Sequence, residues 1–139
     1  MKIWLYYIGK PKDAHANALA EDFVGRTARW TTMEMREVRP DRTDPFTRHP
    51  DARKIVLDPT GQPMSSASFA AIFSKAEMEG RNLLFLVGGH DGIPAGWATR
   101  ADLLISLSPM TFPHELARAM LAEQIYRALA TLRRHPYPR

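Results

Sequence analysis

The chain of 139 residues contains no cysteine. This absence excludes disulfide bonds, thiolate metal sites and cysteine nucleophiles. No window approaches the roughly 20 consecutive apolar residues that a membrane-spanning helix needs. The amino terminus, MKIWLYYIGKPKD, lacks the apolar segment and the small-residue cleavage site of a signal peptide. We therefore expect no membrane association, and we expect the protein to be cytoplasmic.

Common ligand signatures are missing as well. Neither G-x-G-x-x-G nor G-x-x-x-x-G-K-[ST] occurs, which disfavours a Rossmann dinucleotide site and a P-loop nucleotide site. The five histidines show no H-E-x-x-H or H-x-H spacing. We therefore expect no metal site.

Composition indicates a folded chain with a basic balance. Hydrophobic residues make up 45% and charged residues 24%, which is typical of one globular domain, here residues 1–139. The net charge of +4 and the pI of about 9.7 favour a polyanionic partner, although an ordinary basic protein has the same balance. Four basic residues crowd the last thirteen positions: Arg127, Arg133, Arg134 and Arg139.

Strand-like and helix-like segments alternate along the chain. Apolar, β-branched or aromatic runs predict strands at 2–8, 33–38, 54–58, 82–87 and 102–107. Periodicity and cap residues predict helices at 13–29, 65–79, 97–100 and 113–133, while 39–52 has no periodicity and is expected to be a loop. Such alternation predicts an α/β fold with a mostly parallel sheet of five to six strands and helices on both faces.

Two of the predicted strands end in small residues. Gly88-Gly89 follows the fully apolar run NLLFLV. In open parallel sheets, ligands bind beyond the carboxyl ends of the strands, and glycine permits close approach of the backbone. A plain strand-to-loop turn is the alternative interpretation.

The second strand end is the loop from Leu107 to Pro113, LSPMTFP. Its backbone groups could hydrogen-bond an adenine edge, and Leu107, Met110 and Phe112 offer apolar contact. In the alternative interpretation, Thr111 caps the next helix and Pro113 lies in its first turn.

The last helix and the tail carry polar candidates. Glu123 and Arg127 are an i,i+4 pair, which without context is a solvated ion pair. The tail HPYPR contains two prolines, which favour order over fraying. A tyrosine can stack on a base, and an arginine can hold a phosphate.

Taken together, KIVLD, FLVGGHDGIP, SLSPMTFPHELARAMLAEQIYRAL and the late HPY resemble the SPOUT superfamily of knotted methyltransferases. Within it the chain resembles the RlmH family, which methylates N3 of a pseudouridine in large-subunit ribosomal RNA. The resemblance covers essentially the whole chain. It implies an α/β trefoil knot with a knot region at about 82–139, S-adenosylmethionine as methyl donor, an obligate homodimer, and the ribosome as the partner that carries the substrate RNA.

The resemblance also implies site residues. Those expected to hold the cofactor are Leu57, Gly88, Gly89, Leu107, Ser108, Pro109, Met110, Thr111 and Phe112. Those expected around the target base are His114, Glu123, Arg127, His135, Tyr137 and Arg139, with the tail of one protomer completing the site of the other. Arg127 or Arg139 is expected to stabilise charge, Tyr137 to position the base, and His114 or His135 to accept a proton.

Two departures from the family pattern bear on RNA binding. A Lys/Arg/Gly-rich loop and helix is shortened here to 39–52, so RNA contacts are expected from Arg39, Arg42, Arg48 and Arg53. Position 138 is proline where the family has histidine, so the role of that histidine is lost or passes to His135. Two other functions stay open: a non-catalytic ribosome-associated RNA-binding module, and a SPOUT methyltransferase acting on tRNA.

Overall fold

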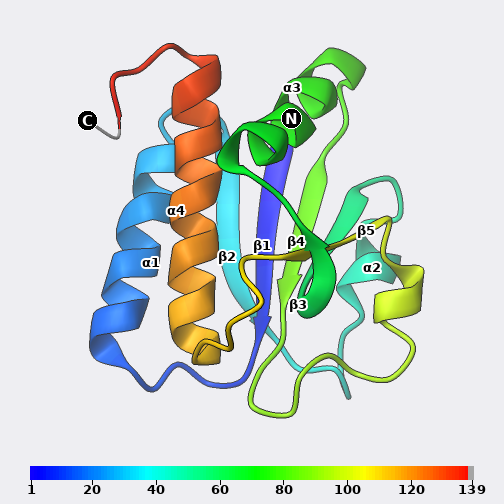
Figure 1. Cartoon of the computed structure of the whole chain (residues 1–139). Helices are drawn as coiled ribbons and strands as arrows, with labels where there is room; N and C mark the ends of the chain where they lie inside the picture. Colours follow the sequence, from blue (N-terminus) through cyan, green and yellow to red (C-terminus); the bar gives the residue numbers. More distant parts are fainter. Residues whose placement is uncertain (138–139) are drawn as a thin grey trace.

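A five-stranded parallel sheet runs through residues 1–137, the part of the chain that this computed structural model describes (Figure 1). The strand order is β2-β1-β4-β3-β5. The strands are β1 (Lys2–Ile8), β2 (Thr32–Val38), β3 (Arg53–Pro63), β4 (Leu83–Val87) and β5 (Leu103–Ser106). The expected α/β class with a parallel sheet is confirmed.

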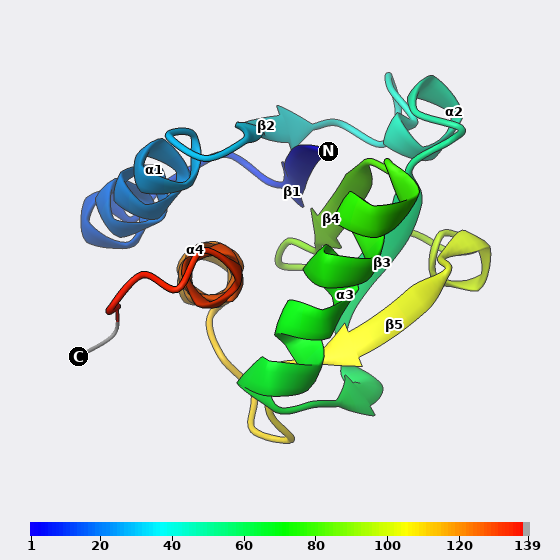
Figure 2. The ribbon, with the colours of Figure 1, turned by 90° about the horizontal axis from the view of Figure 1, so that it is seen from above.

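Helices cover both faces of the sheet, but unevenly. The helices are α1 (Ala14–Thr27), α2 (Pro45–Arg48), α3 (Ser66–Glu79) and α4 (His114–Leu132), with a 3-10 turn at Ala98–Arg100. The view from above separates α1, α3 and α4 from α2 on the other side of the sheet (Figure 2). The expectation of helices on both faces is confirmed, although one face has only a single helical turn, the 3-10 turn and loops.

The two faces are set by side-chain alternation along the strands. In β1, Ile3 and Leu5 join the core under the three long helices, whereas Trp4 and Tyr6 join a second core with Phe46 and Trp97. Successive strand residues point to opposite faces, so one short apolar strand supplies both cores. Every residue of β4 is buried, because this strand lies between two others and is covered on both sides.

Helix ends follow the sequence signals closely. The Asp13 carboxylate accepts the N–H groups of His15 and Ala16 at the start of α1. Ser65 caps α3, and Gly80 ends it with a left-handed φ of 64°. These caps confirm the expected boundaries to within one or two residues.

Two elements differ from the sequence expectation. The segment expected to be a loop contains α2, a single turn that starts where Asp44 caps it and Pro45 takes the first helical position. Four residues are too few to show a helical period. In addition, β3 does not end near Asp58 but continues to Pro63, with a bulge that lets both Leu57 and Gln62 pair with Ile105 of β5.

The extension of β3 lies directly against β5. A Cβ at Gly61 would lie 2.6 Å from the backbone carbon of Ile105, so only glycine fits where these two backbones meet. The chain leaves β5 at this contact and enters the loop that leads to α4 (Figure 1). The trefoil knot implied by the resemblance stays a prediction for this region.

Buried charge fixes the start of α4. The Glu115 carboxylate accepts the backbone N–H groups of Lys12 and Asp13, each at 2.6 Å. One turn later, Arg118 is 1% exposed, and its guanidinium carbon lies 3.7 Å from the centre of the Tyr7 ring. These contacts tie α4 to the end of β1 and to the loop before α1.

Because of these bonds, acid should weaken the fold through Glu115. Burial alone would raise the pKa of Glu115, but the N–H donors of Lys12 and Asp13 and the nearby Arg118 hold it below its ordinary value of 4.5. A depressed carboxyl pKa contributes stability above the unfolded-state pKa and loses it as the pH falls through the folded-state pKa. We expect Glu115→Gln to lower the free energy of unfolding at pH 7 by about 2 kcal/mol and to flatten its decline below about pH 4.5. Urea unfolding at pH 7 and pH 3.5 measures both effects, with Glu21→Gln on the exposed face of α1 as control; an unchanged decline in Glu115→Gln would refute the assignment.

Candidate functional site

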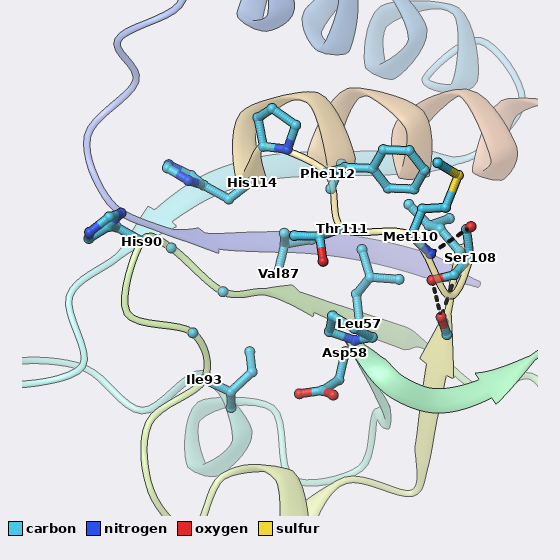
Figure 3. Close-up of a pocket in the computed structure, with 18 residues that line it drawn as sticks. Leu57, Asp58, Val87, His90, Ile93, Ser108, Met110, Thr111, Phe112 and His114 are labelled. Carbon is cyan, nitrogen blue, oxygen red and sulfur yellow. Dashed lines mark hydrogen bonds between the residues drawn. The ribbon is translucent and has the colours of Figure 1, made fainter.

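The carboxyl ends of β4 and β5 and the bulged middle of β3 meet around a cavity of about 430 Å³ (Figure 3). Leu57 and Asp58 come from β3, Val87 ends β4, and the loop after β5 supplies the opposite wall. Ligand sites in parallel sheets occupy this edge, and the volume lies within the range of small-molecule and cofactor pockets.

Two glycines form one rim of the cavity, and neither leaves room for a side chain. A Cβ at Gly88 would lie 2.8 Å from the carbonyl carbon of Gly92, and one at Gly89 would lie 2.6 Å from the carbonyl oxygen of Ile8. The turn is closed by a hydrogen bond of 3.0 Å from the Gly92 N–H to the Gly89 carbonyl. Gly92 adopts a φ of 79°, which favours glycine.

Serine hydroxyls hold the opposite wall in shape. The Ser106 hydroxyl donates to the Ser108 carbonyl at 2.8 Å, and the Ser108 hydroxyl accepts the Met110 N–H at 3.0 Å (Figure 3). Thr111 does not cap α4, because Pro113 occupies the cap position and no side chain bonds there. Met110 lines the cavity and is 72% exposed, so a ligand with an apolar part can cover it.

Most residues expected to hold the cofactor lie around this one cavity. Pro109 belongs to the loop but does not line the cavity, and His114 lies on its wall at the start of α4. The expected residues that do line it are Leu57, Gly88, Gly89, Leu107, Ser108, Met110, Thr111 and Phe112.

Sequence reasoning missed several lining side chains, among them the polar Asp58 and His90 and the apolar Ile93. Asp58 is the last residue of KIVLD and directly follows Leu57, a predicted cofactor residue. Its place in the sequence could therefore have predicted that it lines the cavity. One of its oxygens accepts the N–H and hydroxyl of Thr60 at 2.8 and 2.6 Å, which fixes the carboxylate beside the cavity.

Polar side chains of the second half of α4 and of the tail form a hydrogen-bonded cluster away from the cavity. Glu123 accepts hydrogen bonds from Arg127 at 2.7 and 3.1 Å and from the Tyr137 hydroxyl at 2.5 Å. The Tyr137 ring packs edge-on against Tyr126, with ring centres 4.8 Å apart. The structure therefore brings together three of the residues expected around the target base.

The other tail residues have different settings. His135 accepts the Tyr137 N–H through Nδ1 at 3.2 Å, and its ring lies edge-on to Trp30. A neutral His135 in this arrangement carries its proton on Nε2. Arg139, and Pro138 where the family has histidine, lie outside the described residues.

The cavity and the cluster of Glu123, Arg127 and Tyr137 lie far apart within one chain. His114 is the first residue of α4, and Arg127 follows 13 positions later, about 20 Å along the helix axis. The described tail lies near the carboxyl-terminal end of α4, whereas the cavity lies near the amino-terminal end (Figure 1). A single protomer therefore does not place Arg127 and Tyr137 at the cavity.

The fold and the cavity define an α/β protein with a cavity at the carboxyl edge of a parallel sheet. The chain belongs to the SPOUT methyltransferase family, because the family model described as "Predicted SPOUT methyltransferase" matches residues 1–138. The resemblance noted from the sequence is thus confirmed. The chain is a methyltransferase, and its reaction requires a methyl donor.

Named relatives and a solved structure agree with this assignment. Ribosomal RNA large subunit methyltransferase H of Solibacter usitatus (strain Ellin6076) is 70% identical over 139 residues, covering all of both chains. The protein of the same name from Chromobacterium violaceum is 34% identical, covering 100% of this chain and 99% of its own. A probable methylase family protein from Haemophilus influenzae Rd KW20 shares the fold, with a TM-score of 0.59 at 9% identity over 97% of this chain and 67% of that one.

None of the helices within residues 1–137 combines the length and apolar content of a bilayer span. No group of three or more His, Asp or Glu side chains in the same part of the chain is arranged to hold a metal ion.

The Tyr137 hydroxyl should remain protonated far into the alkaline range. Burial and the bond to Glu123 raise the pKa of Tyr137 to about 12. A raised folded-state pKa means that the contribution to stability is complete below pH 10 and is lost between about pH 10 and 12. We expect Glu123→Gln to bring this pKa back towards 10, because the acceptor loses its charge. A pH titration followed by carbon NMR on protein with isotope-labelled tyrosine measures the Tyr137 pKa, and Tyr137→Phe assigns its signal. A Tyr137 that titrates near pH 10 in the wild-type protein would contradict the contact with Glu123.

Proposed function

We propose that this methyltransferase moves the methyl group of S-adenosylmethionine to N3 of a pseudouridine in large-subunit ribosomal RNA. The observation that carries the proposal is the cavity at the carboxyl edge, which gathers eight of the nine residues expected to hold the cofactor. Full-length identity of 70% to a protein named ribosomal RNA large subunit methyltransferase H supports the RNA substrate. A ribosomal substrate also supports a cytoplasmic location.

The residues of the cavity suit this cofactor. Gly88 and Gly89 let the rim of the cavity pack closely against Gly92 and Ile8, and the 107–112 loop is held in shape by its own serines. Met110 and Phe112 would cover the apolar part of the donor, and Asp58 would accept hydrogen bonds from ribose hydroxyls. When bound, S-adenosylmethionine supplies a methyl group that is already activated, so the protein contributes mainly alignment.

The target nitrogen must lose a proton before or during methylation. His114 lies on the cavity wall and is better placed to accept this proton than His135, whose Nδ1 already accepts a backbone N–H. Arg127 would stabilise charge on the neighbouring carbonyl oxygens. Tyr137 would position the base as a neutral donor, and Glu123 would hold both side chains in place.

These roles require two copies of the chain. Arg127 lies about 20 Å from His114 along α4, so the cluster must reach the cavity of a partner protomer. A hollow next to His114 carries Leu19 and Leu116, which are 44% and 40% exposed. Apolar side chains exposed beside the cavity fit a homodimer contact in which the partner brings Glu123, Arg127, Tyr137 and Arg139.

Methyl transfer to ribosomes tests the proposed reaction. Ribosomes that lack the modification should take up about one labelled methyl group per large subunit from S-adenosylmethionine, and nucleotide mapping should place it on N3 of a pseudouridine. The same assay with tRNA tests the other RNA target, and naked ribosomal RNA tests the need for the assembled particle. Cofactor binding without transfer to any RNA would favour a non-catalytic module instead, and a labelled tRNA would redirect the assignment.

The glycine rim should decide cofactor affinity. Gly88→Ala forces the turn to shift, because the added carbon meets the Gly92 backbone at 2.8 Å. We expect the affinity for S-adenosylmethionine, measured by calorimetry, to fall at least about tenfold. Gly25→Ala is the matched control, since nothing lies within 4 Å of a Cβ at that exposed helical position. If Gly88→Ala and Gly25→Ala bound the cofactor equally well, the cavity would not be the cofactor site.

A further inference from the structure

A second cavity lies at the carboxyl ends of β1 and β2, outside the cofactor site. It has a volume of about 300 Å³ and is enclosed by the end of β2 and the segment that leads to α2. Tyr6 forms its floor. Four of the residues that line it are arginines: Arg36, Arg39, Arg42 and Arg48.

Within the described part of the chain, three of these arginines lack an acidic partner for their charge. Arg36 binds Glu34 at 3.0 Å, but Arg39, Arg42 and Arg48 form no salt bridge within residues 1–137. Each of the three is exposed. Among the described residues, Glu37 is the one carboxylate that lines the cavity. The cavity therefore holds an excess of positive charge that a ligand can neutralise.

The backbone and the floor keep the arginines close together. A hydrogen bond of 2.9 Å from the Arg42 N–H to the Arg39 carbonyl closes a turn directly after β2. Beneath them, the Tyr6 hydroxyl lies 2.8 Å from Nε2 of His49, whose ring stacks on Trp4 with centres 3.9 Å apart. Burial, followed by the charges of Arg48, Lys2 and Arg36, lowers the pKa of His49, so this floor is neutral and packed at pH 7.

This cavity opens at the same edge of the sheet as the cofactor site. Tyr6 of β1 pairs with Arg36 of β2 on one side and with Leu86 of β4 on the other. β2 is thus two strand spacings, about 10 Å, from the strand that ends in the glycine rim. Gly89 of that rim lies against Ile8, so the end of β1 stands between the two cavities. The segment between β2 and α2 and the glycine loop both lie at the carboxyl edge (Figure 1).

Arg53 does not belong to this group. It is the first residue of β3 and pairs with Leu83, the first residue of β4, so it lies at the amino edge of the sheet. The structure therefore does not bring Arg53 together with Arg39, Arg42 and Arg48, the other arginines from which RNA contacts are expected. A parallel sheet separates the start of one strand from the ends of the others by the length of the strands.

We propose that the cavity of Arg39, Arg42 and Arg48 holds a backbone phosphate of the substrate RNA and anchors the strand beside the cofactor site. Guanidinium groups bind phosphate oxygens through several planar donors, and such contacts set position and register rather than sequence. Because both cavities open at this edge and the strands β2 and β4 are only about 10 Å apart, one RNA strand can reach both cavities. The inference rests on the proposed RNA substrate and adds the surface that orients it.

RNA binding by Arg39→Gln/Arg42→Gln tests the proposal. We expect its affinity for a single-stranded RNA fragment that contains the target to fall about tenfold, with a salt dependence shallower by about 0.7 in slope, because the contact with one phosphate is lost. Cofactor affinity should not change. The matched control is Arg29→Gln/Lys75→Gln, which removes two exposed positive charges, one from the turn after α1 and one from α3. The control should bind RNA with nearly wild-type affinity and slope.

The outcomes separate this inference from the proposed reaction. A wild-type protein that binds the RNA but transfers no methyl group would refute the reaction and leave the anchoring contact supported by the double variant. A wild-type protein that methylates, with equal affinities in Arg39→Gln/Arg42→Gln and in the control, would overturn the anchor. Binding of inorganic phosphate at this cavity, with RNA affinity unaffected by the substitutions, would assign it to a small anion and would overturn the anchor as well.

Discussion

The site depends on backbones that approach too closely for any side chain. Gly61 lies against Ile105, Gly88 against Gly92, and Gly89 against Ile8, each so near that a Cβ would fall within 3.0 Å of another backbone atom. These contacts bring the ends of β1, β3, β4 and β5 to one edge. They also direct the chain after β5 into the loop that walls the cavity. Without these contacts the glycine rim of the cavity would not form. The loop that leads from β5 to α4 would also begin at a different place.

Helix α4 separates the cavity from the cluster of Glu123, Arg127 and Tyr137. Glu115 and Arg118 tie its beginning to the β1–α1 region, beside the cavity. Its second half carries Glu123 and Arg127, which form a hydrogen-bonded cluster with Tyr137 of the tail. A straight helix cannot bring its two ends together, so the cluster and the cavity can meet only between two chains. The exposed leucines beside His114 suit such a contact.

Much of the architecture follows from local signals in the sequence. Alternating apolar runs and helix caps such as Asp13, Ser65 and Gly80 predict the strands and long helices, because these signals act within a few residues. α2 and the extension of β3 escape prediction, since a four-residue helix has no period and a bulge interrupts alternation. The glycine rim is predictable from strand-end chemistry. The separation of Arg53 from Arg39, Arg42 and Arg48 could not be predicted, because it depends on the edge of the sheet at which each residue lies.

Mixed dimers test most directly whether the site is shared between two chains. One variant carries Gly88→Arg, which blocks the cavity, and the other carries Arg127→Ala, which removes the charge stabiliser; each alone should be inactive in methyl transfer. When the two are unfolded together and refolded, the account predicts recovery of about a quarter of wild-type activity, because half of the dimers are mixed and each has one intact pair of cavity and cluster. No recovery in mixed dimers would contradict the account and place the whole site within a single chain.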